Sequence, residues 1–364
     1  MLKNLQKILL FPFSLFYGMV IRLRNWLFDK NILNSTGFDL PVITVGNITV
    51  GGTGKTPHVE YLVKLLKDEH NIAVLSRGYK RKTRNFNIVT ASSSVSTSGD
   101  EALQIKCKYP GITVAVDRKR VHGINEILAK EPDVDLVILD DAYQHRYVRA
   151  GLSILLIDFN RPLTKDCLFP AGRLREPGSS AKRADIVLVT KSPARQGPGE
   201  TEEKIKEIPL SSAQQVFFTG LSYDRPVNIF TGENPGIKMN QIAEDLKNVL
   251  LVSGIADPGP LVSYLNEYKL NIKHLKYPDH HSFNNRDRRL IREKYMSMPE
   301  GQRCLITTEK DAIRLREILV EEDFPDDKLF YLGINVIFRD EDKSKFDKLI
   351  IDYAGKNRRN GSLS

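Results

Sequence analysis

A glycine-rich segment near the N-terminus constrains this chain more than any other feature. Residues 49–56 read TVGGTGKT, directly after an apolar run at 40–45 and directly before a helical pattern at 57–66. Glycines let backbone N–H groups curl around phosphate oxygens, and the helix N-terminus adds positive potential. The segment predicts a nucleotide-binding P-loop in which Lys55 neutralises the β- and γ-phosphates and Thr56 holds Mg²⁺. The predicted nucleotide-binding residues are Thr49, Val50, Gly51, Gly52, Thr53, Gly54, Lys55 and Thr56.

A second strand ends in two carboxylates, as a Walker B element does. Residues 134–141 read VDLVILDD, so Asp140 and Asp141 stand at the end of an apolar run. Mg²⁺ has to bridge the phosphates and a carboxylate at neighbouring strand ends, which makes the two segments a matched pair. Either aspartate is a candidate metal ligand. No Asn-Lys-x-Asp segment, the guanine reader of GTPases, occurs in the sequence, so ATP is the expected nucleotide.

Apolar runs alternate with helical patterns along the first half of the chain. They are apolar on both faces, which predicts a parallel sheet sandwiched between helices in an α/β fold. A polar, Pro- and Gly-rich stretch at 192–215 indicates a boundary, and the α/β pattern resumes after it with strands at 249–253 and 304–307. We therefore predict four regions: an N-terminal helix (1–30), a P-loop domain (31–215), a smaller α/β domain (216–353) and a basic disordered tail (354–364). The expected strands of the first sheet are 40–45, 71–76, 112–116, 134–139, 152–157 and 186–190, and the second domain is expected to contain helices from about Pro258 and over 310–319.

The N-terminal segment raises the question of a membrane. Residues 8–21 carry no charge, but fourteen residues are too few to span, since a spanning helix needs about 20. Aromatic rings and cationic flanks favour a helix lying in the membrane interface. A signal peptide is less favoured, because Arg22 and Arg24 stand where a small-residue cleavage site belongs. A core helix of a soluble domain is the other alternative.

Composition narrows the partners without selecting one. The chain has 54 basic and 45 acidic side chains, a net charge of +9, which favours an anionic partner such as nucleotide phosphate, acidic lipid or nucleic acid. No nucleic-acid-binding motif is recognisable, so that class is the least favoured. The cysteines Cys107, Cys167 and Cys304 form no CxxC pair, which indicates a reducing compartment and no thiolate zinc site.

Three further polar segments carry candidate chemistry. Residues 98–101 (SGDE) suit a helix cap, which explains Ser98 but leaves Asp100 without a role. Residues 169–177 (FPAGRLREP) place Arg175 and Glu176 in a loop, where guanidinium groups can stabilise phosphoryl charge or simply lie in solvent. Residues 277–283 (YPDHHSF) contain an Asp-His-His turn that can move a proton, although an adjacent His pair is often only a surface feature.

Taken together, these segments resemble those of one family, the tetraacyldisaccharide 4'-kinases, also called lipid A 4'-kinases. The resemblance covers most of the chain. In the 139–146 segment, Ala142 and Tyr143 stand where the family more usually has Gly-Leu. The matching segments are PVITVGNITVGGTGKTP from Pro41, LSRGYKR from Leu75, SGDEAL from Ser98, LDDAYQHR from Leu139, LFPAGRLREP from Leu168, SGIADP from Ser253, YPDHHSF from Tyr277 and TTEKDAIRL from Thr307.

The resemblance implies transfer of the γ-phosphate of ATP, with Mg²⁺, to the 4'-hydroxyl of a tetraacyldisaccharide 1-phosphate in lipid A synthesis. It makes Asp100 the expected base, assisted by Asp279, His280 and His281 with His280 preferred. Thr56, Asp140 and Asp141 are the expected metal ligands. Catalysis is expected to require closure of the two domains over the nucleotide. Expected contacts to phosphate or substrate are Arg77, Arg118, Lys119, Arg120, Gln144, Arg175 and Glu176.

The implied partners are the glycolipid substrate and the membrane surface, with no nucleic acid and no obligate protein partner. The implied location is the cytoplasmic face of the bacterial inner membrane. The alternative is a membrane-associated P-loop ATPase switch that acts on a protein partner. It shares the loop and the basic charge, but it leaves the Asp-His-His turn and the 168–177 loop without a role.

Overall fold

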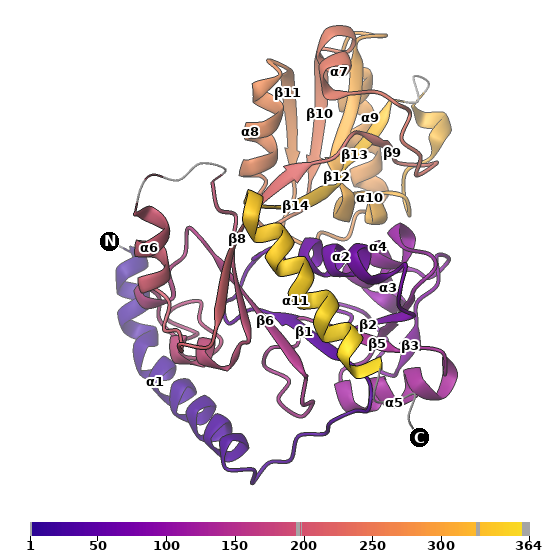
Figure 1. Ribbon diagram of the computed structural model, residues 1–364. Coiled ribbons are helices and arrows are strands. Elements are labelled where there is room, and N and C mark those ends of the chain that lie inside the picture. Colours follow the sequence, from indigo (N-terminus) through magenta and orange to yellow (C-terminus); the bar gives the residue numbers. More distant parts are fainter. Residues whose placement is uncertain (1, 194–196, 198, 325–327, 359–364) are drawn as a thin grey trace. The chain divides into compact units, whose positions relative to one another are not determined.

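The computed structural model describes residues 2–193, 197, 199–324 and 328–358, and it separates into two compact units (Figure 1). Unit 1 comprises Met1–Ser98, Ile105–Leu221 and Val336–Ser364, and unit 2 comprises Gly99–Gln104 and Ser222–Asn335. Each unit has its own sheet. Helix α4 (Asp100–Lys108) contributes its first residues to unit 2 and the rest to unit 1.

Unit 1 is built on a nine-stranded sheet in the order β14-β8-β7-β6-β1-β5-β2-β4-β3. The pairs from β8 through to β4 are all parallel, and β3 runs antiparallel to β4. The P-loop strand β1 lies between β5 and β6, so the carboxyl end of the Asp140 strand is beside that of the P-loop strand. The strands are β1 (Val42–Gly46), β2 (Ile72–Ser76), β3 (Asn87–Ile88), β4 (Thr113–Val116), β5 (Leu136–Asp140), β6 (Leu152–Asp158), β7 (Ile186–Thr190), β8 (Gln215–Tyr223) and β14 (Ile334–Phe338).

The central strands of this sheet are covered on both faces. Every residue of β1, β2, β5 and β7 is buried. Helix α2 (Lys55–Leu66) packs on β1 and β5, and helix α5 (Arg120–Lys130) packs on β2 and β4. The α/β fold and its sandwiched parallel sheet are therefore confirmed. One core cluster contains Val42, Ala73, Leu75, Ala115, Ile124, Ile127, Val137 and Leu139, and another contains Ile48, Leu155, Ile157, Val187 and Phe218.

Two helices of unit 1 differ from the sequence-based expectation. A short helix lies within the stretch at 192–215, for which the sequence indicates a boundary and predicts no helix. Three glutamates in its first turn favour a helix N-terminus there. Helix α11 continues to Arg358, so residues 354–358 are helical rather than part of a tail, and 359–364 lie outside the described residues. The helices are α1 (Leu2–Asp29), α2 (Lys55–Leu66), α3 (Val95–Ser98), α5 (Arg120–Lys130), α6 (Glu200–Lys206) and α11 (Asp340–Arg358), with 3₁₀ turns at Leu163–Lys165 and Gly178–Arg183.

Helix α1 has an unusual distribution of polar and apolar side chains. The face that packs on the protein includes the buried polar residues Ser14 and Asn25, whereas large apolar side chains on the other face are exposed. Ser14 Oγ accepts a hydrogen bond from the Ala171 N–H, and the Tyr17 hydroxyl donates to the Arg175 carbonyl. The exposed large apolar residues of α1 are Ile8, Leu9, Leu10, Phe11, Phe13, Leu15, Phe16, Met19, Val20, Leu23 and Trp26.

The length of α1 exceeds the fourteen-residue estimate. Residues Lys7–Asp29 form 23 continuous helical residues, and an 18-residue window within them reaches a mean hydropathy of 1.2. By length and composition the helix is long and apolar enough to cross a membrane. The sequence-based length was too short because it counted only the uncharged residues 8–21, whereas the helix continues through Arg22 and Arg24. The apolar helix weakly indicates membrane association.

Unit 2 has a five-stranded sheet in the order β11-β10-β12-β13-β9, parallel except for the last pair. Helix α9 packs on β10 and β12, and α10 packs on β12 and β13. This is the smaller α/β part that the sequence predicts, although its last helix ends at Leu315 instead of 319. Its elements are β9 (Val227–Asn228), α7 (Met239–Asp245), β10 (Asn248–Ser253), α8 (Gly259–Glu267), β11 (Asn271–Lys276), α9 (Asn285–Met296), β12 (Arg303–Thr308), α10 (Glu309–Leu315), a 3₁₀ turn (Glu321–Asp323) and β13 (Leu329–Leu332).

Candidate active site

The P-loop follows β1 and ends where α2 begins. Gly51 and Gly54 have φ angles of 116° and 85°, conformations that suit glycine, so the loop needs them. Asn47 Nδ2 donates to Thr53 Oγ1 at 2.8 Å, which ties the two ends of the loop together. The His58 ring, buried in the first turn of α2, contacts the Gly54 carbonyl at 2.7 Å. Contacts among residues 47–58 therefore fix the shape of the loop.

The two predicted metal ligands differ in their surroundings. Asp140 is 1% exposed at the end of β5, and its backbone carbonyl accepts from Arg120 Nη2 at 3.1 Å. Asp141 has a left-handed backbone (φ 47°), and its carboxylate lies 3.6 Å from Lys55 Nζ and 3.2 Å from Arg175 Nη1. Burial alone raises the pKa of Asp141, but the Lys55 and Arg175 charges outweigh it and lower that pKa. Both carboxylates therefore lie at the edge of the sheet that carries the P-loop.

The loop around Arg175 is attached to the P-loop segment by backbone hydrogen bonds. The Val50 N–H donates to the Arg173 carbonyl at 2.7 Å, and the Arg175 N–H donates to the Ile48 carbonyl at 2.7 Å. This short antiparallel bridge fixes the Arg175 side chain beside Asp141. Glu176, next in sequence, is fully buried and paired with Arg183 at 2.6 Å, so its carboxylate serves the fold of this loop.

The segment after Asp141 packs against the start of the P-loop. Gln144 Nε2 donates to the Asn47 carbonyl at 2.6 Å. A Cβ on Gly46 would lie 2.8 Å from Tyr143 Cβ, so the close approach of this segment requires the glycine. Tyr143 is buried, and its hydroxyl donates to the Ser180 carbonyl at 2.6 Å. Gln144 thus positions the loop through its amide.

The remaining predicted phosphate contacts follow the ends of β2 and β4. Arg77, Arg118 and Lys119 are exposed there. Arg120 is 2% exposed and donates to the Asp117 and Asp140 carbonyls, and burial lowers its pKa to about 10. Because parallel strands end at one edge of the sheet, all four side chains belong to the P-loop edge, but only the exposed ones have a free path to a ligand.

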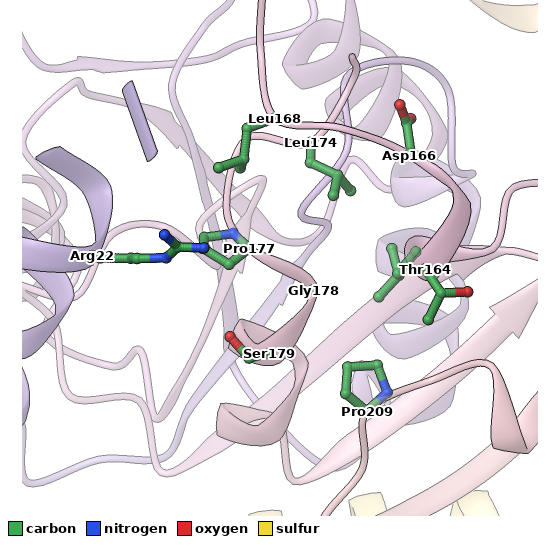
Figure 2. A pocket seen from close by; sticks show the side chains of 10 residues that line it. Arg22, Thr164, Asp166, Leu168, Leu174, Pro177, Gly178, Ser179 and Pro209 are labelled. Atoms are coloured by element: carbon green, nitrogen blue, oxygen red, sulfur yellow. The ribbon is translucent and has the colours of Figure 1, made fainter. Parts of the chain in front are cut away.

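A pocket of about 320 Å³ lies beside α1, where Arg22 faces the 3₁₀ turn at Leu163–Lys165 and Leu168 and Leu174 of the following loop (Figure 2). Its lining is mostly apolar. None of the predicted catalytic, phosphate or metal residues lines it. The pocket is therefore separate from the residues that the sequence assigns to the nucleotide.

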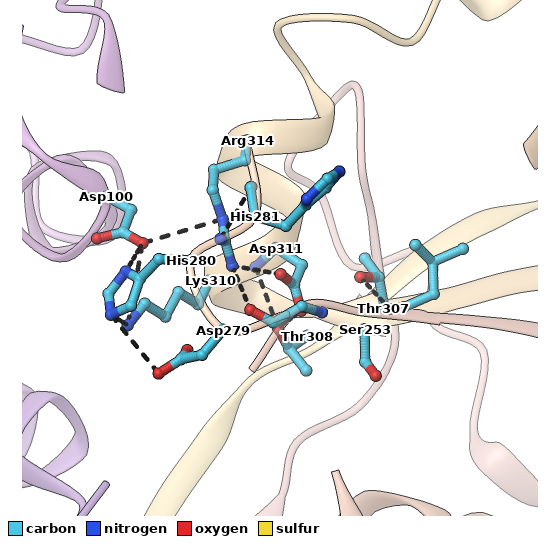
Figure 3. Close-up of polar contacts among 12 residues, drawn as sticks. Asp100, Ser253, Asp279, His280, His281, Thr307, Thr308, Lys310, Asp311 and Arg314 are labelled. Carbon is cyan, nitrogen blue, oxygen red and sulfur yellow. Dashed lines mark hydrogen bonds and ion pairs between the residues drawn. The ribbon is translucent and has the colours of Figure 1, made fainter. Parts of the chain in front are cut away.

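Unit 2 brings Asp100 and the Asp-His-His turn together, although 180 residues separate them (Figure 3). His280 Nδ1 lies 2.8 Å from Asp100 Oδ2, and Asp100 Oδ1 accepts from the Glu101 N–H at 3.0 Å. Burial by itself raises the pKa of Asp100. The His280 hydrogen bond and the Lys310 and Arg314 charges have the larger, opposite effect, and together they lower the pKa to about 2. The buried carboxylate is held ionised by its neighbours.

The second histidine has different neighbours. His281 Nε2 lies 2.9 Å from Asp287 Oδ2, and its ring stacks on Tyr277 with centroids 4.7 Å apart. Figure 3 shows the His281 ring pointing away from Asp100. Asp279 is only loosely associated, with Oδ2 3.9 Å from His280 Nε2. Of the three residues in the turn, His280 is the one that contacts Asp100.

Helix α10 supplies two cations that the sequence analysis assigned no role. Lys310 Nζ lies 3.2 Å from His280 Nε2 and 3.1 Å from Glu101 Oε1. Arg314 is 5% exposed and donates to the carbonyls of Gly254 and His281. Both residues lie in the family segment that begins at Thr307, so the sequence shows the motif. It does not show that these two side chains lie on the face of α10 that meets Asp100 and His280.

A third cation was missed beside the P-loop. A Cβ on Gly51 would lie 3.0 Å from Arg161 Nη1, and Arg161 Nε lies 3.9 Å from Asp158 at the end of β6. In the sequence, the one sign that Arg161 lies near the P-loop is its position three residues after β6, which ends in Asp158. Across the described residues, no group of three or more His, Cys, Asp or Glu side chains has the geometry of a metal site.

Comparison with known proteins identifies the family. The chain matches the family described as tetraacyldisaccharide-1-P 4'-kinase over residues 6–353. This chain belongs to the tetraacyldisaccharide 4'-kinase family. It is 45% identical over 357 residues to the tetraacyldisaccharide 4'-kinase of Phocaeicola vulgatus, covering 98% of this chain and 97% of the relative. It is 41% identical over 348 residues to the enzyme of that name from Porphyromonas gingivalis, covering 93% and 95%.

A solved structure agrees with the sequence relatives. The fold is similar to that of LpxK from Aquifex aeolicus, crystallised in complex with ATP, with a TM-score of 0.74 and 30% identity. The similarity covers 97% of this chain and 99% of that protein. The family expected from the sequence segments is therefore confirmed along almost the whole chain.

Proposed function

We propose a division of labour by which this chain works as an ATP-dependent tetraacyldisaccharide 4'-kinase of lipid A synthesis: the P-loop edge of unit 1 holds ATP, and Asp100 with His280 prepares the acceptor hydroxyl. The observation that carries the proposal is the 2.8 Å contact between Asp100 and His280, because it joins two distant family segments into one proton-handling pair. The kinase class itself follows from the family.

The P-loop residues supply position and charge. Backbone N–H groups of residues 51–56 surround the β- and γ-phosphates, and Lys55 leaves Asp141 to neutralise them. Arg175, fixed beside Asp141, stabilises charge that develops on the transferred phosphoryl group. The exposed Arg77 and Arg118 contact phosphate groups of ATP or of the acceptor.

The expected Mg²⁺ fits the oxygen donors at this edge. A hydroxyl and two carboxylates, from Thr56, Asp140 and Asp141, are the ligand types that Mg²⁺ prefers, and a few such ligands with phosphate oxygens and waters suffice. When bound, the ion would neutralise charge on the β- and γ-phosphates. We assign it these three residues.

The chemical step requires few covalent roles from the protein. The 4'-hydroxyl oxygen forms a bond to the γ-phosphorus, the bond from that phosphorus to the β-γ bridging oxygen breaks, and ADP leaves. Asp100 accepts the hydroxyl proton, and His280 orients its carboxylate. Because its neighbours lower the pKa of Asp100 to about 2, the carboxylate is ionised throughout the physiological range and is in the form that can accept a proton.

The acceptor and its location follow from α1. We assign the exposed apolar face of α1 to the membrane surface, where the acyl chains of the lipid A precursor reside. Lys7 and Arg22, which are exposed on α1, would meet anionic headgroups there. We assign the enzyme to the cytoplasmic side of the inner membrane, because ATP is available on that side.

A labelling experiment tests this function. Purified protein in detergent with Mg²⁺ and γ-labelled ATP is compared with and without tetraacyldisaccharide 1-phosphate. Transfer of the label to the added tetraacyldisaccharide 1-phosphate supports the kinase. ATP hydrolysis that ignores the lipid, with no labelled product, would instead support the ATPase switch. The variant Asp100→Asn should lose label transfer and still bind ATP.

A further inference from the structure

Helix α10 places two cations, one helical turn apart, against the Asp100–His280 pair. Lys310 Nζ and Arg314 Nε each lie 3.9 Å from Asp100 Oδ2. Arg314 is also occupied by the Gly254 and His281 carbonyls and by Asp311, so it holds the backbone of the turn. Lys310 contacts the His280 ring instead: its ammonium group lies at Nε2, on the side of the ring opposite Asp100.

The His280 ring lies between an acceptor and a donor (Figure 3). On one side Nδ1 faces Asp100 Oδ2 at 2.8 Å, and on the other Nε2 faces Lys310 Nζ at 3.2 Å. An ammonium group offers only protons, so Nε2 has to accept. The Asp279 carboxylate lies 3.9 Å from Nε2, which is too far to take a proton from it. The proton of the neutral ring therefore lies on Nδ1 and is donated to Asp100.

We propose that Lys310 is a positioning residue for phosphoryl transfer: it holds His280 in the tautomer with the proton on Nδ1, which in turn orients Asp100 as the base. The inference rests on the proposed function, in which Asp100 accepts the hydroxyl proton. Lys310 itself is held in place by Glu101 at 3.1 Å. The ionised Asp100 carboxylate also favours the proton on Nδ1, so the two neighbours act together. Loss of the Lys310 donor at Nε2 removes one of these two constraints, so a larger fraction of His280 rings carries the proton on Nε2 or turns away from Asp100.

The charges around the pair give the inference a pH signature. Lys310 faces Asp100, Glu101, Asp279 and His280, and Asp100 faces His280, Lys310 and Arg314. The Lys310 charge helps to keep the pKa of Asp100 low. Removing it raises that pKa, so the acidic limb of the rate profile, where Asp100 gains a proton, moves to higher pH.

The first test observes the tautomer directly and needs no acceptor lipid. The ring nitrogens of ¹⁵N-histidine-labelled protein are examined by NMR, and the His280→Gln variant identifies the His280 signals. The proposal predicts a protonated Nδ1 and an unprotonated Nε2 in the wild type, and a mixture of tautomers in Lys310→Met. A wild-type ring protonated at Nε2 would overturn it, whether or not the variant folds.

The second test is kinetic. Lys310→Met should lower kcat roughly 10- to 100-fold with little change in the KM for ATP, because misplacement of a catalytic group costs about this much. The acidic limb of its pH–rate profile should move to higher pH. In Lys310→Arg, which keeps the charge, the limb should lie at the wild-type pH. Lys294→Met, at a partly exposed position of α9 in the same unit, is the matched control and should behave as wild type.

The outcomes separate the two proposals. If Lys310→Met keeps the wild-type tautomer, kcat and pH profile, Lys310 has no positioning role. If the wild type transfers no phosphate to the acceptor, the proposed function fails, and the NMR result still decides the tautomer. A loss of kcat with an unmoved pH profile and an unchanged tautomer would mark Lys310 as merely structural.

Discussion

The P-loop of unit 1 and the Asp100–His280 cluster of unit 2 differ in how much of the chain each one needs. The loop is fixed by contacts such as Asn47 to Thr53 and His58 to Gly54, all within twelve residues. The cluster joins side chains 180 residues apart and depends on a third segment, α10, for its cations. A binding site can be local, but a proton-handling pair here is a product of the tertiary fold.

The two regions also differ in how they balance charge. At the P-loop edge, Lys55 and Arg175 both contact the Asp141 carboxylate. When ATP binds, its phosphates have to replace this carboxylate as the partner of Lys55. In the cluster, Asp100 is 4% exposed and is surrounded by His280, Lys310 and Arg314. We infer that the first region is built to rearrange upon binding, whereas the second is preorganised.

The largest effect is expected at the P-loop. Lys55→Ala should weaken ATP affinity roughly 100-fold, because it removes a charge from the phosphates and frees Asp141 to repel them. Turnover should fall in parallel. Calorimetric titration with ATP and the labelling assay measure both. Lys64→Ala, on an exposed position of the same helix, is the control. Unchanged ATP affinity in Lys55→Ala would break the assignment of this region to the nucleotide.

The next effect is expected in the cluster and should spare binding. His280→Ala should lower kcat roughly 100-fold, since Asp100 loses the donor that orients it. ATP affinity should stay at the wild-type value because the proposal assigns nucleotide binding to the P-loop of unit 1, whereas His280 belongs to unit 2. A fall in ATP affinity as large as that of Lys55→Ala would contradict the division of labour.

The regions should also respond differently to acid. Burial lowers the pKa of His58 from 6.5 to about 4, so the unfolded state binds its proton first. Unit 1 should therefore lose stability as the pH falls from 6.5 towards 4, by up to roughly 3 kcal/mol from this group. Asp100, with a pKa lowered from 3.8 to about 2, weakens its own unit only as the pH falls below 3.8. Hydrogen exchange of each unit across this range measures the difference.

A variant sharpens that comparison. His58→Gln keeps a polar side chain in the first turn of α2 but cannot titrate, so the stability of unit 1 should become less dependent on pH between 6.5 and 4. If the variant keeps the full wild-type slope, another group is responsible for it.

The smallest effect is expected at the neighbouring histidine. His281→Ala should lower the free energy of unfolding by about 1 kcal/mol, because it loses the Asp287 hydrogen bond and the Tyr277 stacking. Its kcat should remain near that of the wild type, in contrast to His280→Ala. Urea unfolding and the labelling assay measure the two quantities. A loss of kcat equal to that of His280→Ala would mean that the two histidines share the role.

The sequence was sufficient for features that depend on local order. Strand, glycine loop and helix follow one another at 40–66, so the P-loop and its place at the sheet edge could be predicted. Fully apolar runs predicted the buried strands for the same reason. The extent of α1 could not be judged from its uncharged stretch, because the helix continues past Arg22 and Arg24.

Side-chain roles that depend on packing were out of reach. Arg120 and Glu176 remain predicted substrate contacts, but the sequence did not show that both are buried. Arg120 donates to the Asp140 carbonyl and Glu176 pairs with Arg183, and residue type alone does not reveal such partners. Lys310 was overlooked because its role depends on the register of α10 against the Asp-His-His turn. Residue type and spacing cannot show which face of a short helix meets a residue 210 positions earlier.

The most direct test of the account compares Asp100→Asn with the wild type in a single turnover. The enzyme is preloaded with γ-labelled ATP and Mg²⁺, mixed with excess acceptor lipid, and the rate of label transfer is recorded beside the ATP affinity. The account predicts wild-type affinity and a transfer rate reduced roughly 10²- to 10⁴-fold, the range for a lost general base. Transfer at the wild-type rate would contradict it, because Asp100 would then have no part in the chemistry.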